Sequence, residues 1–341
     1  MHSGHRAISH WAIVVLSLLT SPCACRNRSP EPSVTRNTEQ TSSAAATSTA
    51  TTTQSPTKAE PLDCPGFFAG KLVFQVDNDD LAEASDIAVS AKNPGVFWSH
   101  NDSGGRARIF AIASDGRDLG TYHVEGAELE DWEDMAIGPG PGQNKVYIYI
   151  GDIGANKKAR NRITVYRLEE PDVKADQKNK KRKLDRTKAF DFAFPDEKSH
   201  DAESLMVDPR TSDLYIVTKP RHGAPVVYRA KAPLDAKRTT ILEDVTTLNS
   251  ISTGPHSPTL VTSGDISFDG SMILLRTYER AYLWQRGESE TIDTALSRAP
   301  CPVPLQQEAQ GESIAFAPDG TGYYSVSEGR HPKVYFYARK R

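Results

Sequence analysis

Asp131-Trp132-Glu133-Asp134-Met135-Ala136-Ile137 is one of five copies of a phrase in which acidic or polar residues lead into a short apolar strand. The other copies span residues 83–89, 201–207, 262–268 and 310–316. Recurrence at this scale is typical of repeat folds such as β-propellers, whose blades bury their apolar faces only against neighbouring blades. The repeat predicts an all-β propeller with the acidic residues at equivalent points.

The spacing of the copies favours five blades. The intervals between Asp86, Asp134, Ser204, Asp265 and Ser313 are 48, 70, 61 and 48 residues. A four-stranded blade needs roughly 40–50 residues, so the interval of 70 is one blade plus an insert. The insert is the lysine-rich segment 172–188, which is too charged for a central strand and which we expect to be a solvated excursion. Six blades are the alternative.

Further β-patterned segments complete four-stranded blades. Second strands are expected at 96–100, 145–150, 213–218, 272–277 and 322–327, and third strands at 108–113, 162–168, 225–230, 281–285 and 333–338. Outer strands are expected at 119–124, 190–194, 239–244 and 302–306, which leaves the fifth blade with three. We expect the N-terminal segment 71–76 to supply its fourth strand, because a closed ring has no exposed sheet edge.

The propeller region, residues 63–341, contains two cysteines, Cys64 and Cys301. Closure by segment 71–76 would bring Cys64 beside the blade whose outer strand follows Cys301. In an oxidising compartment such a pair is more often bonded than free. We therefore expect a Cys64–Cys301 disulfide.

The first 62 residues predict export. Residues 1–25 have a basic start and a short apolar core, which is typical of a signal peptide, and residues 26–62 are a Ser/Thr/Pro-rich segment that we expect to be a disordered tether. Cys23 and Cys25 are candidates for lipidation, so secretion, a periplasmic location and anchoring in the envelope as a lipoprotein all stay open. With a net charge of −3 and a mean hydropathy of −0.52, we expect a soluble monomer without a nucleic-acid partner, whose membrane contact is limited to that anchor.

We expect the functional site at one mouth of the central channel. There the loops that enter the inner strands meet the loops between the second and third strands. Carboxylates that converge there repel one another unless a cation or basic side chains compensate. The available ligand atoms are oxygens, without Cys or paired His, which favours Ca²⁺, with Mg²⁺ as the alternative, over zinc. The expected metal ligands are Asp86, Glu133, Asp134, Asp152 and Asp265.

Other polar residues of the same loops are candidates for holding a small polar or anionic ligand, or a cell-surface polymer. They are Asn101, Asp102, Asp131, Glu203, Arg276, Glu312 and Glu328. Candidate catalytic residues are Lys219 and Arg276, which could hold an anionic group, and His100 and His222, which could move protons. Ser204 and Ser313 lack a nucleophile-elbow context and are interpreted as hydrogen-bonding residues between blades. The acidic ring itself could equally serve such a structural role.

The chain resembles a family of largely uncharacterised exported bacterial β-propeller proteins over about residues 65–341. The matching motifs are Trp98-Ser99-His100-Asn101-Asp102-Ser103-Gly104, Asp131-Trp132-Glu133-Asp134, Gly151-Asp152-Ile153-Gly154, Arg276-Thr277-Tyr278 and Gln310-Gly311-Glu312-Ser313. The resemblance implies a propeller fold and an exported location, but no particular activity. The family's second aspartate after Gly154 is Ala155 here, which weakens a metal role for that loop.

By architecture alone, the chain is also similar to calcium-dependent phytase-like, lactonase and apyrase propellers, although a fold does not carry a function. Two hypotheses result. The first is an exported protein that binds a polar ligand at an acidic and basic channel mouth through Ca²⁺. The alternative is a Ca²⁺-dependent hydrolase of phosphate esters or lactones. Binding is favoured, because no nucleophile can be paired with a base.

Overall fold

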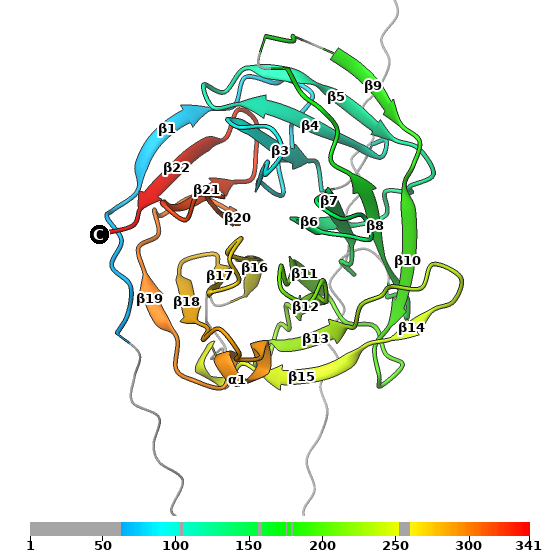
Figure 1. Ribbon diagram of the computed structural model, residues 1–341, viewed down its shortest axis with the longest axis vertical. Helices are drawn as coiled ribbons and strands as arrows, with labels where there is room; N and C mark the ends of the chain where they lie inside the picture. The colour runs from blue at the N-terminus through cyan, green and yellow to red at the C-terminus, as the bar shows by residue number, and fades with distance from the viewer. Residues whose placement is uncertain (1–62, 103–104, 156–158, 175, 179, 252–259) are drawn as a thin grey trace, which may run out of the picture. The chain divides into compact units, whose positions relative to one another are not determined.

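A computed structural model describes residues 63–102, 105–155, 159–174, 176–178, 180–251 and 260–341. The signal peptide and tether expected within residues 1–62, including Cys23 and Cys25, lie outside the described residues. Five small, mostly antiparallel sheets form a five-bladed β-propeller (Figure 1). The prediction of an all-β propeller is confirmed, and the count is five blades, not six.

The blades follow one another along the chain. Blade 1 contains β2 (Ala88–Val89), β3 (Val96–His100), β4 (Arg108–Ala113) and β5 (Asp118–Val124), and blade 2 contains β6 (Trp132–Pro139), β7 (Val146–Asp152), β8 (Ile163–Glu169) and β10 (Lys188–Ala193). Blade 3 contains β11 (Ala202–Val207), β12 (Leu214–Thr218), β13 (Val226–Ala230) and β15 (Glu243–Thr247), and blade 4 contains β16 (Val261–Ile266), β17 (Met272–Thr277), β18 (Ala281–Gln285) and β19 (Cys301–Val303). Blade 5 contains β20 (Gly311–Phe316), β21 (Gly322–Ser327) and β22 (Lys333–Ala338).

The N-terminal strand β1 (Lys71–Gln75) lies against the last strand of the chain. It pairs antiparallel with β22, so that Lys71 is opposite Phe336 and Gln75 is opposite Lys333 (Figure 1). A disulfide joins Cys64, seven residues before β1, to Cys301 at the start of β19. The expected disulfide is thus present, and it links the N-terminal segment to blade 4.

Two sheets carry a fifth strand that the repeat did not predict. The strand β9 (Lys180–Leu184) pairs parallel with β5, and β14 (Thr240–Ile241) pairs parallel with β10. The expected outer strand 239–244 is therefore divided between blades 2 and 3. Its division occurs at Leu242, which is buried in the core between these blades and donates its N–H to the Ala193 carbonyl.

Apolar side chains fill the space between blades. Strands β3, β11, β17 and β20 are buried along their whole length, because each is covered on both faces by neighbouring blades. Three tryptophans, Trp98, Trp132 and Trp284, are buried in this space, and each indole N–H donates a hydrogen bond. Besides strands the fold has two short helices, η1 (Asn249–Ile251) and α1 (Ile292–Leu296), and none among the described residues is long and apolar enough to cross a membrane.

Candidate functional site

The inner strands of blades 2 to 5 share a β-bulge at one equivalent point. The register shifts between Trp132 and Asp134, Ala202 and Ser204, Val261 and Ser263, and Gly311 and Ser313. A bulge places two residues opposite one and re-aims their side chains. The added residue is Glu133, Glu203, Thr262 or Glu312, so three of these four bulges carry a glutamate.

The strand register corrects the sequence repeat in blade 4. The repeat aligns Asp265 with Asp134, but Asp134 lies opposite Gly151 in the first pair after the bulge. The equivalent residue of blade 4 is Ser263, opposite Arg276. Asp265 lies opposite Leu274, two residues further along the strand. At about 3.3 Å per residue, this is roughly 7 Å deeper in the channel. Asp265 is therefore not level with Asp134.

The residues that follow the bulges join each blade to the next. The Asp134 carboxylate accepts the Leu205 N–H at 2.7 Å. The hydroxyl of Ser313 accepts the Ile87 N–H at 2.9 Å, and that of Ser263 accepts the Ile314 N–H at 3.3 Å. Ser313 thus has the inter-blade role that its sequence context predicted. Ser204 does not match this pattern, since its hydroxyl has no hydrogen-bond partner within the described part of the chain.

Asp86 and Asp134 form a buried carboxyl pair at the level of these contacts. Ser313 donates its hydroxyl to Asp86, and Ser263 donates its hydroxyl to Asp134 at 3.1 Å. Burial raises the pKa of Asp86 to about 7. Burial and the neighbouring charge of Asp86 raise the pKa of Asp134 well above its usual range. The pair therefore retains a proton near neutral pH, and three of its four oxygens accept hydrogen bonds from other blades.

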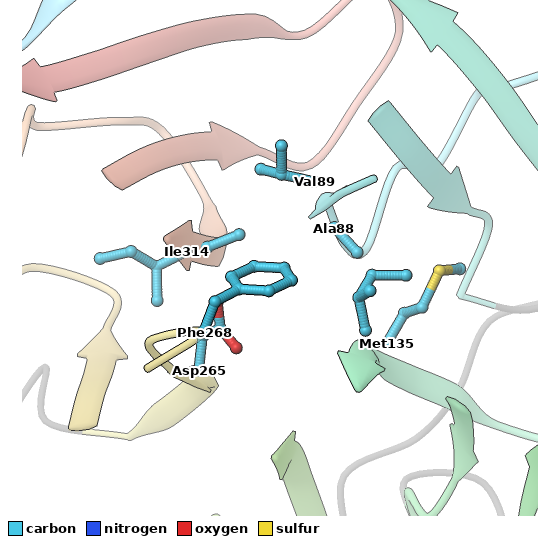
Figure 2. Close-up of a pocket in the computed structure, with 8 residues that line it drawn as sticks. Ala88, Val89, Met135, Asp265, Phe268 and Ile314 are labelled. Carbon is cyan, nitrogen blue, oxygen red and sulfur yellow. The ribbon is translucent and has the colours of Figure 1, made fainter. Parts of the chain in front are cut away.

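Asp265 lies at a small apolar cavity further down the channel. Figure 2 shows the Phe268 ring among Ala88, Met135 and Ile314, with Asp265 beside it. The cavity measures about 10 Å³, which is room for about one water molecule. The Asp265 carboxylate accepts the N–H groups of Phe316 and Ile266, both at 2.8 Å, and burial raises its pKa to about 7. There is no space for a ligand here.

Five carboxylates gather at the mouth of the channel, and we call them the mouth carboxylates: Asp102, Asp131, Glu133, Asp201 and Glu203. They form two triads, Asp102–Asp131–Glu133 and Glu133–Asp201–Glu203, and one oxygen from each member lies within 4.8 Å of the others in its triad. Asp131, Glu133 and Glu203 are buried. Burial, followed by the charges of Glu203, Asp102 and Asp131, raises the pKa of Glu133 well above its usual range.

The loop between β7 and β8 packs directly against the mouth carboxylates. Gly154 touches Glu133 and Asp131 so closely that a Cβ atom at this position would overlap both carboxylates. The Ala155 N–H donates to Asp201 at 2.8 Å. Ala155 therefore contributes a main-chain donor to this acidic group.

The expected metal ligand Asp152 contacts residues that flank the mouth carboxylates. Its carboxylate accepts the N–H groups of Glu130 at 3.2 Å and Asp131 at 3.1 Å, and it pairs with the Arg160 guanidinium at 2.7 Å. Of the five expected metal ligands, the structure thus brings only Glu133 into the described triads. Asp86, Asp134, Asp152 and Asp265 make the contacts given above.

A lysine and two further glutamates lie beside the second triad. Lys219 pairs with Glu203 at 2.8 Å and donates to the Tyr278 hydroxyl at 2.8 Å. Burial alone would lower the pKa of Lys219, but the charges of Glu203, Tyr278 and Glu312 raise it. Burial raises the pKa of Glu312 to about 8, although Lys219 opposes this shift. Burial and the charge of Glu83 raise the pKa of Glu328.

Two of the expected ligand and catalytic residues, Arg276 and Asn101, make hydrogen bonds within the fold. Arg276 is fully buried, donates to the carbonyls of Ser313 and Val326, and pairs with Glu308 at 3.1 Å. Its guanidinium joins blade 4 to blade 5, and the anion-holding role expected from the sequence stays a prediction. Asn101 accepts the Glu83 N–H and donates to the Asp80 carbonyl.

The two candidate histidines differ in environment. His100 is fully buried with its ring edge-on to Trp132, and burial lowers its pKa to about 4. It is therefore neutral at physiological pH and inaccessible to a ligand in solution. His222 lies exposed in the loop between β12 and β13.

Two residues of the site were not among the sequence-based site residues. Asp201 opens its copy of the repeated phrase two residues before Glu203, as Asp131 does before Glu133, so the repeat contained the signal. Tyr278 follows the Arg276-Thr277 motif but had no feature that marked it as the partner of Lys219. No protein-family model matches the chain, and no curated protein matches it.

Proposed function

We propose that the mouth carboxylates bind a divalent cation that prefers oxygen ligands, Ca²⁺ or alternatively Mg²⁺, and that the site holds a polar or anionic ligand. The observation that carries the proposal is the position of Glu133, which is buried and belongs to both triads. Two carboxylates 4.8 Å apart repel by about 3 kcal/mol at an effective dielectric constant of about 20. A cation among them would replace this repulsion with attraction.

The chemistry of the ligand atoms supports calcium. Ca²⁺ takes about six to eight oxygen ligands in flexible geometry, with carboxylates foremost. The mouth carboxylates come from both loop sets, Asp102 from the loop after β3 and the others from segments entering or beginning β6 and β11. The ammonium group of Lys219 offsets one of the five charges and is already paired with Glu203.

Lys219 and Tyr278 support the proposed ligand site. Their polar atoms lie beside Glu203, so a ligand that contacts the cation could also contact an ammonium group and a phenol hydroxyl. An anionic group, such as a phosphate or a carboxylate, would be attracted both by the bound cation and by the ammonium group of Lys219. The same chemistry would suit a polar small molecule or one unit of a cell-surface polymer.

A second candidate function is the hydrolysis of a phosphate ester or lactone, and Glu312 favours it. With a pKa of about 8, this buried side chain carries a proton at neutral pH near Lys219 and Glu203. A protonated carboxyl group at a mouth can donate that proton to a leaving group, a role for which His100 is too deeply buried. A bound divalent cation would supply polarisation of the substrate oxygen.

Thermal unfolding with and without calcium tests the binding proposal. A cation that binds only the folded protein at a hundredfold excess over Kd adds about 2.7 kcal/mol. The melting temperature of chelator-treated protein should rise by several degrees on addition of Ca²⁺, with no rise in Glu133→Gln. The exposed Glu288→Gln is the matched control and should respond like the parent. Turnover of a phosphate ester or lactone that is lost with chelator, and reduced in Glu312→Gln, would select the hydrolase.

We further propose that β1 closes the ring, that four strands are the basic blade with β9 and β14 as additions, and that the protein is exported. The pairing of β1 with β22 supports the closure. The Cys64–Cys301 disulfide supports export, because such bonds persist mainly in oxidising compartments. Detection of the protein in the cytoplasm with an intact Met1 would contradict export.

A further inference from the structure

A second charged feature lies far along the chain from the mouth residues. Segment 174–188 contains eight basic residues and two acidic ones, Asp176 and Asp185, whereas the whole chain has 41 basic and 44 acidic residues. Four of the basic residues, Lys180, Lys181, Arg182 and Lys183, form the exposed part of β9. A run of four consecutive exposed basic residues therefore lies in one strand at the outer edge of blade 1 (Figure 1).

The fold holds this strand in place. All five residues of β9 pair with β5, from Gly120 opposite Lys180 to Val124 opposite Leu184. A Cβ atom at Gly120 would lie 2.5 Å from the Lys180 carbonyl oxygen, so this pairing requires glycine. Gln177 is buried and donates to the Leu119 carbonyl and the Tyr122 hydroxyl, both at 2.8 Å. The expected solvated excursion is instead a strand attached by specific contacts.

Most of the charge on β9 is not neutralised locally. Within the described residues, the ion pair of β9 is the one between Lys183 and Glu125, at 2.7 Å. Side chains of a strand alternate between its two faces, with neighbours on one face roughly 6.5–7 Å apart. Counted over both faces, β9 therefore carries about one cation per 3.3 Å, and as the last strand of its sheet it presents them along an open edge.

We propose that β9 docks an extended phosphate-bearing polymer that has no bases. The cation spacing is close to that of phosphate polymers, since one nucleic-acid strand carries a phosphate per about 3.4 Å of axis. Segment 174–188 has no aromatic residue on which bases could stack, which argues against a nucleic acid. The exposed large apolar side chains of the described residues are Phe68, Leu72, Val73 and Ile241, all outside this segment, which argues against insertion into a membrane.

Lysines on an edge strand also discourage pairing with other chains. That role requires exposed charge but no affinity for a polymer, so a binding measurement separates the two. The probe is long-chain inorganic polyphosphate, and the full chain is titrated in chelator at several salt concentrations, so that the mouth carboxylates cannot hold it through a metal ion. The test variant is Lys180→Gln with Lys181→Gln and Arg182→Gln. The matched control replaces three exposed basic residues near blade 3, Lys231, Lys237 and Arg238, with Gln.

We expect the test variant to bind at least tenfold more weakly at low salt, with the slope of log Kd against log salt smaller by about 2, at roughly 0.7 per phosphate contact. The control variant should bind like the parent, and the test variant should keep the parent melting temperature. Equal binding by the test variant and the parent, or an equal loss in the control variant, would overturn the proposal. Tighter binding to single-stranded DNA, to polygalacturonate or to vesicles containing phosphatidylglycerol than to polyphosphate would also overturn it.

Discussion

Asp86 is a close neighbour of Asp134 in the centre of the propeller, and both carboxyl groups are fully buried. Their pKa values are raised, so folding takes up protons near neutral pH. A group whose folded pKa exceeds its unfolded pKa stabilises the fold below the unfolded value, near 4, and loses that contribution as the pH rises through the folded value. Asp265, at about 7, and Glu312, at about 8, act in the same direction.

We therefore expect the free energy of unfolding to fall by roughly 3 kcal/mol between pH 6.5 and 8.5. His100 has the opposite sign, since its pKa is lowered, but it loses its influence above about pH 6.5. Asp86→Asn mimics the protonated carboxyl and should reduce the fall by about 1 kcal/mol. Urea unfolding at a series of pH values measures this, with the exposed Asp293→Asn as control. A stability that is flat or rising over this interval would contradict the raised pKa values of these buried carboxyl groups.

Gly154 should be essential for the arrangement of the mouth. In Gly154→Ala, the new methyl group would overlap the carboxylates of Glu133 and Asp131 and push them apart. We expect at least a tenfold loss of calcium affinity with little change in melting temperature in chelator. Gly287→Ala is the control, because its methyl group would meet Glu290 at ordinary contact distance. Parent affinity in Gly154→Ala would mean that the cation does not bind between these two carboxylates.

Arg276 should matter for stability and not for ligand binding. Its guanidinium is buried against Glu308, and removing one partner of a buried ion pair commonly costs about 3–5 kcal/mol. Arg276→Gln should lower the free energy of unfolding by about 3 kcal/mol in urea titration, while the folded fraction keeps its calcium affinity. The opposite pattern, normal stability with lost calcium binding, would show that Arg276 belongs to the binding site.

The N-terminal strand and its disulfide should be needed for closure. A chain of residues 61–341 should fold like the full protein, whereas a chain of residues 78–341 lacks β1 and exposes the edge of β22. We expect the shorter chain to aggregate. Cys64→Ser with Cys301→Ser should retain the fold but lose about 2–4 kcal/mol of stability. A soluble monomer of 78–341 with the melting temperature of the longer chain would refute the closure.

Much of the fold could be predicted from the sequence, because the segment that leads into each inner strand repeats and the blades have similar strand patterns. The third strands of blades 1, 4 and 5 lie at the expected residues, and so does the Cys64–Cys301 disulfide. The alignment of Asp265 was wrong because Ser263 and Asp265 are both polar and flank Gly264, so the sequence offers two registers. Only the bulge between Val261 and Ser263 distinguishes them.

The site residues were harder to predict from the sequence, because the polarity of a residue does not show which atoms it contacts. Arg276 and Asp152 have the residue types of ligand-binding groups, yet burial and hydrogen bonds place both in contacts between blades or loops. The distinction between mouth and interior depends on the depth of each side chain in the channel. That depth follows from strand register, which the repeat alone leaves ambiguous by two residues.

Calorimetric titration of chelator-treated protein with Ca²⁺ tests the central claim most directly. The account predicts saturable binding of calcium to the full chain, at least tenfold weaker in Glu133→Gln and unchanged in Glu288→Gln. Magnesium in place of calcium shows which cation the mouth carboxylates prefer. If neither cation binds at millimolar concentration, or if Glu133→Gln binds calcium as tightly as the parent, the mouth carboxylates are not a cation site.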